Sequence, residues 1–144
     1  MPQLQSRTVL FVCTFNRVRS PMAAGLMRWL YGDKFNVNSC GLHAGEAVDP
    51  LAAVVMAEIG VDLAMHRPKR LDDLLGDKRF TEIVALSEEA WPRVEAVGDA
   101  RVEHWPISDP AESEGSRENR LEAYRLARQA LQDRILEHFG PRSR

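Results

Sequence analysis

The fold is decided by the segment VLFVCTFNRVRSP, which runs from Val9 to Pro21. Its first four residues, 9–12, are all apolar, which is typical of a strand buried on both faces in a parallel sheet. The serine–proline pair at its end predicts a helix start, with Ser20 as the cap and Pro21 in the first turn. The residues in between, 13–19, therefore form a loop that joins a strand to a helix. We call it the cysteine loop.

Strands and helices alternate along the rest of the chain. Apolar and β-branched runs predict strands at residues 8–12, 35–39, 82–86 and 101–105. Caps and helical periodicity predict helices at residues 20–31, 49–59, 71–75, 88–94 and 116–139. This alternation favours an α/β fold, in which a parallel sheet carries helices on both faces. Ligands bind such sheets at the carboxyl ends of the strands, where the cysteine loop lies.

Length and composition indicate a soluble globular protein with one domain, residues 1–144. The chain has 144 residues, of which 44% are hydrophobic and 28% charged, and a net charge of -2. That balance gives no reason to expect nucleic acid or a membrane as a partner. Residues 1–7 lack a signal-peptide pattern, and no apolar run could span a bilayer. We therefore expect a cytoplasmic protein, a compartment that also suits a working thiol.

The cysteine loop has the residues of a phosphate-binding site built around a nucleophile. Cys13 and Arg19 are separated by five residues. A cation and a helix N-terminus both stabilise a thiolate, and successive backbone N–H groups can surround a phosphoryl group. Ser20 can donate a hydrogen bond to the sulfur. The residues expected to bind phosphate are Thr14, Phe15, Asn16, Arg17, Val18, Arg19 and Ser20.

Cleavage of a phosphate ester also needs an acid that protonates the leaving oxygen. Two Asp-Pro pairs could supply it. Asp49 precedes Pro50 at the start of a helix, so capping explains it. Asp109 precedes Pro110 in a rigid loop after the fourth predicted strand, at the same sheet edge as Cys13. Asp109 is therefore the preferred candidate.

At these residues the chain resembles the low-molecular-weight protein tyrosine phosphatases and the thioredoxin-type arsenate reductases, which share one fold. The resemblance is carried by VLFVCTFNRVRSPMAAGL at the start and by segments that follow in matching order: Asn38 to Gly41, Gly60 to Asp62 before His66, Phe80 to Leu86, and Asp109-Pro110. It covers nearly the whole chain.

The resemblance implies a three-layer sandwich with a four-stranded parallel sheet. It implies Cys13 as nucleophile, Arg19 as phosphate ligand, and Asp109 as general acid and then as base for water. It also implies that Asn16, Ser20, Ser39 and His66 form a hydrogen-bond network that holds the loop. No cofactor is expected, and no residues have convincing metal-ligand spacing.

The chain departs from the family pattern at several positions. Phe15 stands where glycine is usual, Arg17 replaces a smaller residue, and Val18 replaces a cysteine common in the phosphatases. Ala111 stands where phosphatases often have an aromatic residue. In lacking that residue the chain looks more like the reductases. Thioredoxin-coupled reductases carry further cysteines after the third strand, but that region here reads LSEEAWP.

Three functions are therefore open. The leading hypothesis is a cysteine-dependent phosphomonoesterase acting on a phosphorylated protein or a small phosphomonoester. The second is an arsenate reductase that uses an external small thiol, or Cys40 if it lies close to Cys13, although Cys40 is more simply a buried apolar residue. The third is a non-catalytic module that binds an oxyanion or a phosphoprotein. The natural substrate and the oligomeric state do not follow from the sequence.

Overall fold

A parallel four-stranded sheet forms the centre of the computed structural model, which describes residues 7–76 and 79–143. The strands are β1 (Arg7–Cys13), β2 (Phe35–Gly41), β3 (Glu82–Ala85) and β4 (Arg101–His104), in the order β2-β1-β3-β4. The predicted α/β fold with a four-stranded parallel sheet is confirmed. The expectations that concern residues 1–6 lie outside the described residues.

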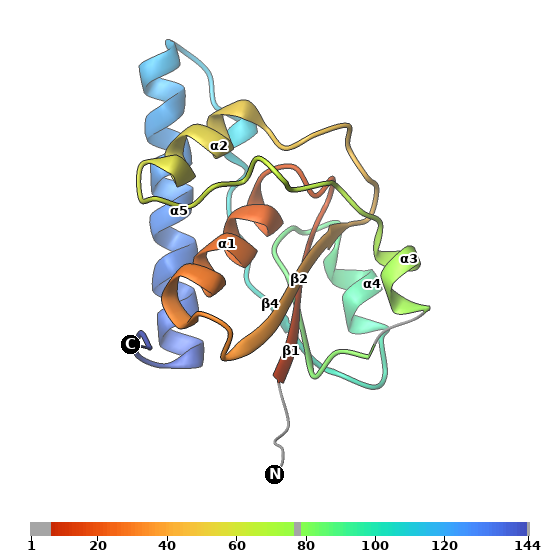
Figure 1. Cartoon of the computed structure of the whole chain (residues 1–144). Coiled ribbons are helices and arrows are strands. Elements are labelled where there is room, and N and C mark those ends of the chain that lie inside the picture. The colour runs from red at the N-terminus through yellow and green to blue at the C-terminus, as the bar shows by residue number, and fades with distance from the viewer. Residues whose placement is uncertain (1–6, 77–78, 144) are drawn as a thin grey trace.

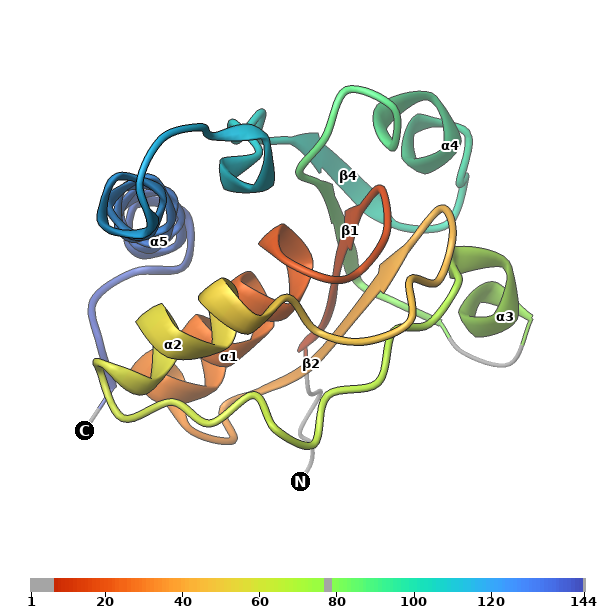
Figure 2. The same cartoon turned by 90° about the horizontal axis from the view of Figure 1, so that it is seen from above.

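Helices cover both faces of the sheet, which gives three layers (Figures 1 and 2). One face carries α1 (Arg19–Tyr31), α2 (Pro50–Ala57) and the long α5 (Arg117–Phe139). The other carries two short helices, α3 (Leu71–Leu75) and α4 (Trp91–Glu95). A 3-10 turn, η1 (Pro110–Glu112), precedes α5. Within the described ranges, no helix is both long and apolar enough to cross a membrane.

Each strand faces two different cores because its side chains alternate between the faces of the sheet. In β1, Val9 and Phe11 pack in the core under α1, α2 and α5. Leu10 and Val12 pack in the smaller core under α3 and α4. All four side chains are fully buried, which explains why this strand reads as a continuous apolar run rather than an alternating one.

The starts of three helices match the sequence, including that of α3 at Leu71, and two differ. The Asp49 carboxylate caps α2, and the Ser116 hydroxyl caps α5. The expectation that Ser20 caps α1 is wrong, because α1 begins at Arg19 and its N-cap, Val18, makes no side-chain cap bond. α4 begins at Trp91 rather than at residue 88.

The strand order creates a crevice beside the cysteine loop. The chain leaves β1 through α1 and reaches β2 on one side, whereas β3 pairs with β1 on the other side. Connections that start in opposite directions from neighbouring strands separate at the carboxyl edge of the sheet, and ligands bind there. The cysteine loop and the segments that follow β3 and β4 meet at this edge.

At the opposite edge, a buried carboxylate links the sheet to α5. Glu82 is 3% exposed and contacts the guanidinium of Arg7 and the ring of His138, whose Nε2 lies 2.8 Å from Glu82 Oε2. Burial acts to raise the pKa of Glu82, but the bonds to His138 and Arg7 outweigh it, so the pKa lies below its ordinary value. A carboxyl group with a lowered pKa stabilises the folded state above its ordinary pKa and loses that contribution as the pH falls.

Replacing Glu82 with glutamine is expected to lower the free energy of unfolding at pH 7 by about 1–2 kcal/mol, because a neutral amide replaces the buried carboxylate that accepts from the charged guanidinium of Arg7. The difference should shrink as the pH falls below about 4, where the wild-type carboxylate also becomes neutral. Urea denaturation over a range of pH measures both effects. Glu95→Gln, at an exposed position of α4, is the control. A deficit that stays constant down to low pH would contradict the role given to Glu82.

Candidate active site

Cys13 ends β1 and is 3% exposed, and its thiol contacts the first turn of α1. Its Sγ lies 2.9 Å from the hydroxyl oxygen of Ser20. That oxygen accepts a bond from Asn16 Nδ2 at 2.8 Å and lies 3.2 Å from the carbonyl oxygen of Cys40. The single hydroxyl hydrogen can therefore go to the carbonyl or to the sulfur. This arrangement uses the Ser20 side chain at the thiol, which explains why it does not cap the helix.

Asn16 holds the cysteine loop from the inside. It is fully buried, and at φ 58° it is the one non-glycine residue with positive φ among the described residues. Its Nδ2 donates to the hydroxyls of Ser20 and, at 3.0 Å, Ser39. Its Oδ1 accepts from the backbone N–H of Lys69 at 2.9 Å, and its carbonyl oxygen lies 2.8 Å from Nε2 of His66. The structure thus brings together the four residues that the resemblance assigned to the network.

The backbone of the loop turns its amide groups to one side. The carbonyl oxygens of Cys13, Thr14, Phe15 and Arg17 accept bonds of 2.9–3.1 Å from N–H groups in the segment 42–49. None of the described peptide bonds is cis. In a trans peptide the carbonyl and the next N–H point in opposite directions. With the Asn16 carbonyl facing His66, the N–H groups of residues 14–18 all point away from these partners, which is the arrangement of an anion-binding nest.

The close approach of β2 to the loop depends on Gly41. A Cβ at this position would lie 2.7 Å from the backbone nitrogen of Asn16 and 2.5 Å from the carbonyl oxygen of His43. Both are backbone atoms that cannot move aside easily. Gly41 therefore permits the contacts between the loop and the segment 42–49.

Arg19 and Asp109 lie together at the mouth of the loop. Arg19 Nη1 donates to the carbonyl oxygen of Ile107 at 2.9 Å and lies 3.5 Å from that of Leu86. Arg19 Nη2 lies 3.6 Å from Asp109 Oδ2. The other carboxylate oxygen of Asp109 accepts the N–H of Ala111 at 3.0 Å and starts η1. The segments after β3 and β4 therefore fix both charged groups.

A cavity of about 370 Å³, the loop cavity, opens at this place. Four predicted site residues line it: Thr14, Phe15, Arg19 and Asp109. The other predicted residues of the loop do not, and Cys13 lies buried next to Thr14. Three glutamates, Glu88, Glu89 and Glu112, also line the cavity. Its wall thus carries four carboxylates and one guanidinium, a charge pattern that the sequence analysis missed although Glu88-Glu89 follows a strand.

The unusual loop residues cause no conflict with the backbone. Phe15 does not have positive φ. The residue lines the loop cavity and is 52% exposed, and its ring centroid lies 5.8 Å from that of His43. Arg17 turns away and donates from Nε to the carbonyl oxygen of Ala47 at 2.7 Å. Val18 is buried in the core. Position 15 needs no glycine because the left-handed conformation falls on Asn16.

Cys40 is separated from Cys13 by the sheet. It pairs in register with Val12, and its side chain packs with Val12 in the core under α3 and α4. Cys13 packs in the opposite core. Burial raises the pKa of the Cys40 thiol, the nearby Cys13 raises it further, and Lys69 opposes both. A thiol in this position is a buried apolar group rather than a nucleophile.

The segment after β3 offers hydroxyl and aromatic groups where a reductase would need sulfur. Ser87 is buried, and its hydroxyl oxygen lies 3.1 Å from Thr14 Oγ1 and 3.2 Å from the N–H of Ala90. The ring of Trp91 stacks on His104, with 5.2 Å between centroids. These contacts give both residues structural roles.

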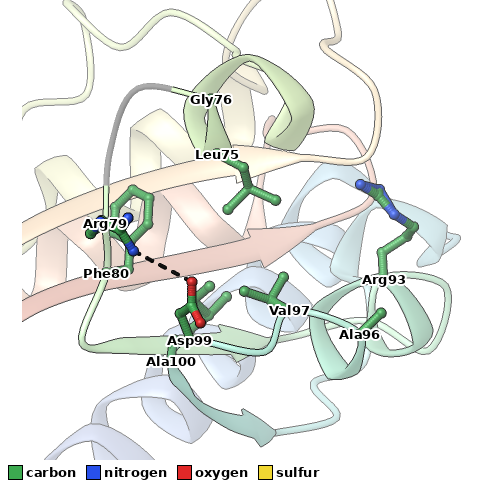
Figure 3. Close-up of a pocket in the computed structure, with 10 residues that line it drawn as sticks. Leu75, Gly76, Arg79, Phe80, Arg93, Ala96, Val97, Asp99 and Ala100 are labelled. Carbon is green, nitrogen blue, oxygen red and sulfur yellow. Dashed lines mark hydrogen bonds and ion pairs between the residues drawn. The ribbon is translucent and has the colours of Figure 1, made fainter.

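A second cavity, of about 490 Å³, lies between α3 and α4 (Figure 3). Leu75, Phe80 and Val97 form its apolar walls, and an ion pair between Arg79 and Asp99 crosses its edge. None of the predicted site residues lines it. In the part of the chain that the structure describes, no three His, Cys, Asp or Glu side chains gather to hold a metal ion.

Comparison with known proteins identifies the family. The profile of the low molecular weight phosphotyrosine protein phosphatases matches residues 8–139. The chain belongs to this family. The family resemblance inferred from the sequence is therefore confirmed, and the protein is an enzyme of a superfamily that contains both hydrolases and oxidoreductases.

Individual relatives fall on both sides of that division. An arsenate reductase of Halalkalibacterium halodurans is 30% identical over 132 residues, which covers 92% of this chain and 94% of the relative. A solved arsenate reductase in an oxidised state superposes with a TM-score of 0.77 at 26% identity, covering 91% of this chain and 95% of that one. The tyrosine phosphatase Wzb of Escherichia coli K30, in complex with sulphate, has a TM-score of 0.72 at 26% identity and covers 94% and 100%.

Replacing Asn16 with alanine is expected to lower the free energy of unfolding by about 2–4 kcal/mol, because buried hydroxyls lose their partner and alanine must adopt positive φ. Urea denaturation measures the loss. Asn36→Ala, at an exposed position of β2, is the matched control. Equal losses in the two variants would contradict the central role of Asn16.

Proposed function

We propose that this protein is a phosphomonoesterase in which Cys13 forms a cysteinyl-phosphate intermediate and Asp109 is the general acid. The observation that carries the proposal is the convergence of Cys13, Arg19 and Asp109 on one anion-binding loop. These groups suffice for both half-reactions of hydrolysis, with water as the only further reactant. The loop amides and Arg19 would stabilise the charge that spreads over the equatorial oxygens during transfer.

In the first step, the Cys13 thiolate attacks phosphorus, and the bond between phosphorus and the ester oxygen breaks. Protonated Asp109 gives its proton to the leaving oxygen. In the second step, the Asp109 carboxylate takes a proton from a water molecule that attacks the phosphocysteine, and the thiolate leaves. Ser20 is placed to donate to the sulfur as it regains its charge. Arg19, anchored to the carbonyl of Ile107, would hold the phosphoryl group in line.

Arsenate reduction is the second candidate, because curated relatives at about 30% identity are arsenate reductases. Reduction of arsenate to arsenite takes two electrons, which two thiols supply as they form a disulfide. Cys13 could be the first of these thiols. Cys40 faces the other side of the sheet, and Ser87 has no sulfur. The second thiol would therefore come from outside the chain, in the form of a small thiol.

Hydrolysis of an aryl phosphate in reducing buffer tests the proposal. Cys13→Ser should lower kcat by about 10⁴-fold or more, and Asp109→Asn by about 10²- to 10⁴-fold. Cys40→Ala and Asp99→Asn are the matched controls and should retain activity. If the wild type does not hydrolyse the ester but forms arsenite from arsenate and a small thiol, the phosphatase proposal is overturned in favour of the arsenate reductase. Oxyanion binding without either reaction would indicate a binding module.

The carboxylates of the loop cavity should also affect which esters are hydrolysed. Glu88→Gln combined with Glu112→Gln is expected to raise kcat/KM for an acidic phosphopeptide by about 3- to 10-fold at low salt, because like-charge repulsion is removed. The gain should diminish at high salt as the charges are screened. Glu95→Gln is the control, and an equal gain in that variant would contradict the effect assigned to the two glutamates of the loop cavity.

A further inference from the structure

A separate cavity of about 420 Å³, the rear cavity, lies behind the cysteine loop. It is formed by α1, β2 and the segment 62–69, and it shares no lining residue with the loop cavity. Its polar and charged lining residues include Arg28, Ser39, Asp62, His66, Arg67 and Lys69. None of them has a place in the proposed hydrolysis except as support for Asn16.

The charges around the rear cavity favour an anion. Arg28, Arg67 and Lys69 supply three cations, whereas Asp62 is the single carboxylate in the lining. One oxygen of Asp62 already accepts the N–H of Ala64 at 2.8 Å. Arg28 Nη2 also donates to the carbonyl oxygen of Val37 at 2.8 Å, and Lys69 Nζ donates to that of Arg67 at 3.3 Å. The lining therefore carries more cationic side chains than carboxylates, which would favour an anion.

The electrostatic field at the wall of the rear cavity is consistent with this excess. Burial is the main influence that lowers the pKa of His66. The bond to Asn16 acts in the opposite direction, and the charges on Lys69 and Arg28 lower the pKa further. The positive charges of the cavity therefore act on His66, and the same electrostatic field would stabilise an anion there.

The rear cavity is directly connected to the cysteine loop through Asn16. Ser39 and His66 line the cavity and bind Asn16 with their side chains, and Lys69 binds it with its backbone N–H. Because the Asn16 carbonyl can only accept, Nε2 of His66 is the donor. Ser39 accepts the Asn16 amide, so its own hydroxyl hydrogen can be donated to a ligand. Three residues that are bonded to Asn16 therefore lie in the wall of the rear cavity.

We propose that the rear cavity binds a tetrahedral oxyanion of the phosphate or sulfate type, and that occupancy is transmitted to the cysteine loop through Asn16. A tetrahedral anion presents acceptor oxygens in several directions, which suits cations and a hydroxyl on different elements. Such a ligand would act at a site distinct from the substrate. The proposal does not depend on the reaction that occurs at Cys13.

Titration of the full chain with sodium sulfate, followed by NMR, tests the proposal. The His66 ring signals report the rear cavity, the Arg19 Nε–H signal reports the loop cavity, and the Asn16 side-chain amide reports the coupling. Sodium chloride at the same ionic strength corrects for screening. We expect a saturable shift of the His66 signals with a midpoint different from that of Arg19. Part of the shift of the Asn16 amide signal should follow the His66 binding curve.

Variants within one segment make the test specific. Arg67→Gln with Lys69→Gln should weaken the His66 midpoint about tenfold and leave that of Arg19 unchanged. Arg70→Gln, whose guanidinium pairs with Asp73 outside the rear cavity, should change neither midpoint. A His66 shift that chloride reproduces, or that follows the Arg19 midpoint in every variant, would overturn the second site. A His66 shift without a response of Asn16 would overturn the coupling.

Discussion

The bonds of the Asn16 side chain are the constraint on which the rest of the site depends. A left-handed residue in the middle of a loop is costly unless its surroundings hold it. Here the amide is bonded to α1, to β2 and to the segment before α3, through Ser20, Ser39 and Lys69. Asparagine tolerates this conformation better than other residues with a side chain. One buried amide therefore positions a loop of seven residues between three elements.

The two sides of the cysteine loop differ in charge. The loop cavity has an acidic wall in which Arg19 is the cation, whereas the rear cavity has three cations and one carboxylate. Arg19 is anchored by the carbonyl of Ile107 and faces Asp109, so its charge is directed into the loop cavity. The acidic wall would oppose anionic groups next to the phosphoryl group and favour neutral or basic ones.

Sheet register separates the two thiols. Consecutive residues of a strand face opposite sides of a sheet. Since Cys40 is paired with Val12 rather than with Cys13, the two sulfur atoms belong to different cores. This arrangement affects the two candidate reactions differently. Hydrolysis needs one thiol, which Cys13 supplies, whereas reduction needs a second thiol from another molecule.

The sequence by itself determined the α/β fold, because apolar runs and caps such as Asp49 are local signals whose meaning does not depend on distant residues. Spacing and position in the sequence also pointed to Cys13, Arg19 and Asp109, and the family resemblance added Asn16, Ser39 and His66. The sequence assigned Ser20 both to the sulfur and to the helix cap, and the tertiary structure decided that it contacts the sulfur and does not cap the helix. The tertiary structure also decided that Arg17 turns outward and that Cys40 lies across the sheet. These outcomes depend on contacts between residues far apart in the chain, and no pattern within a single segment encodes them.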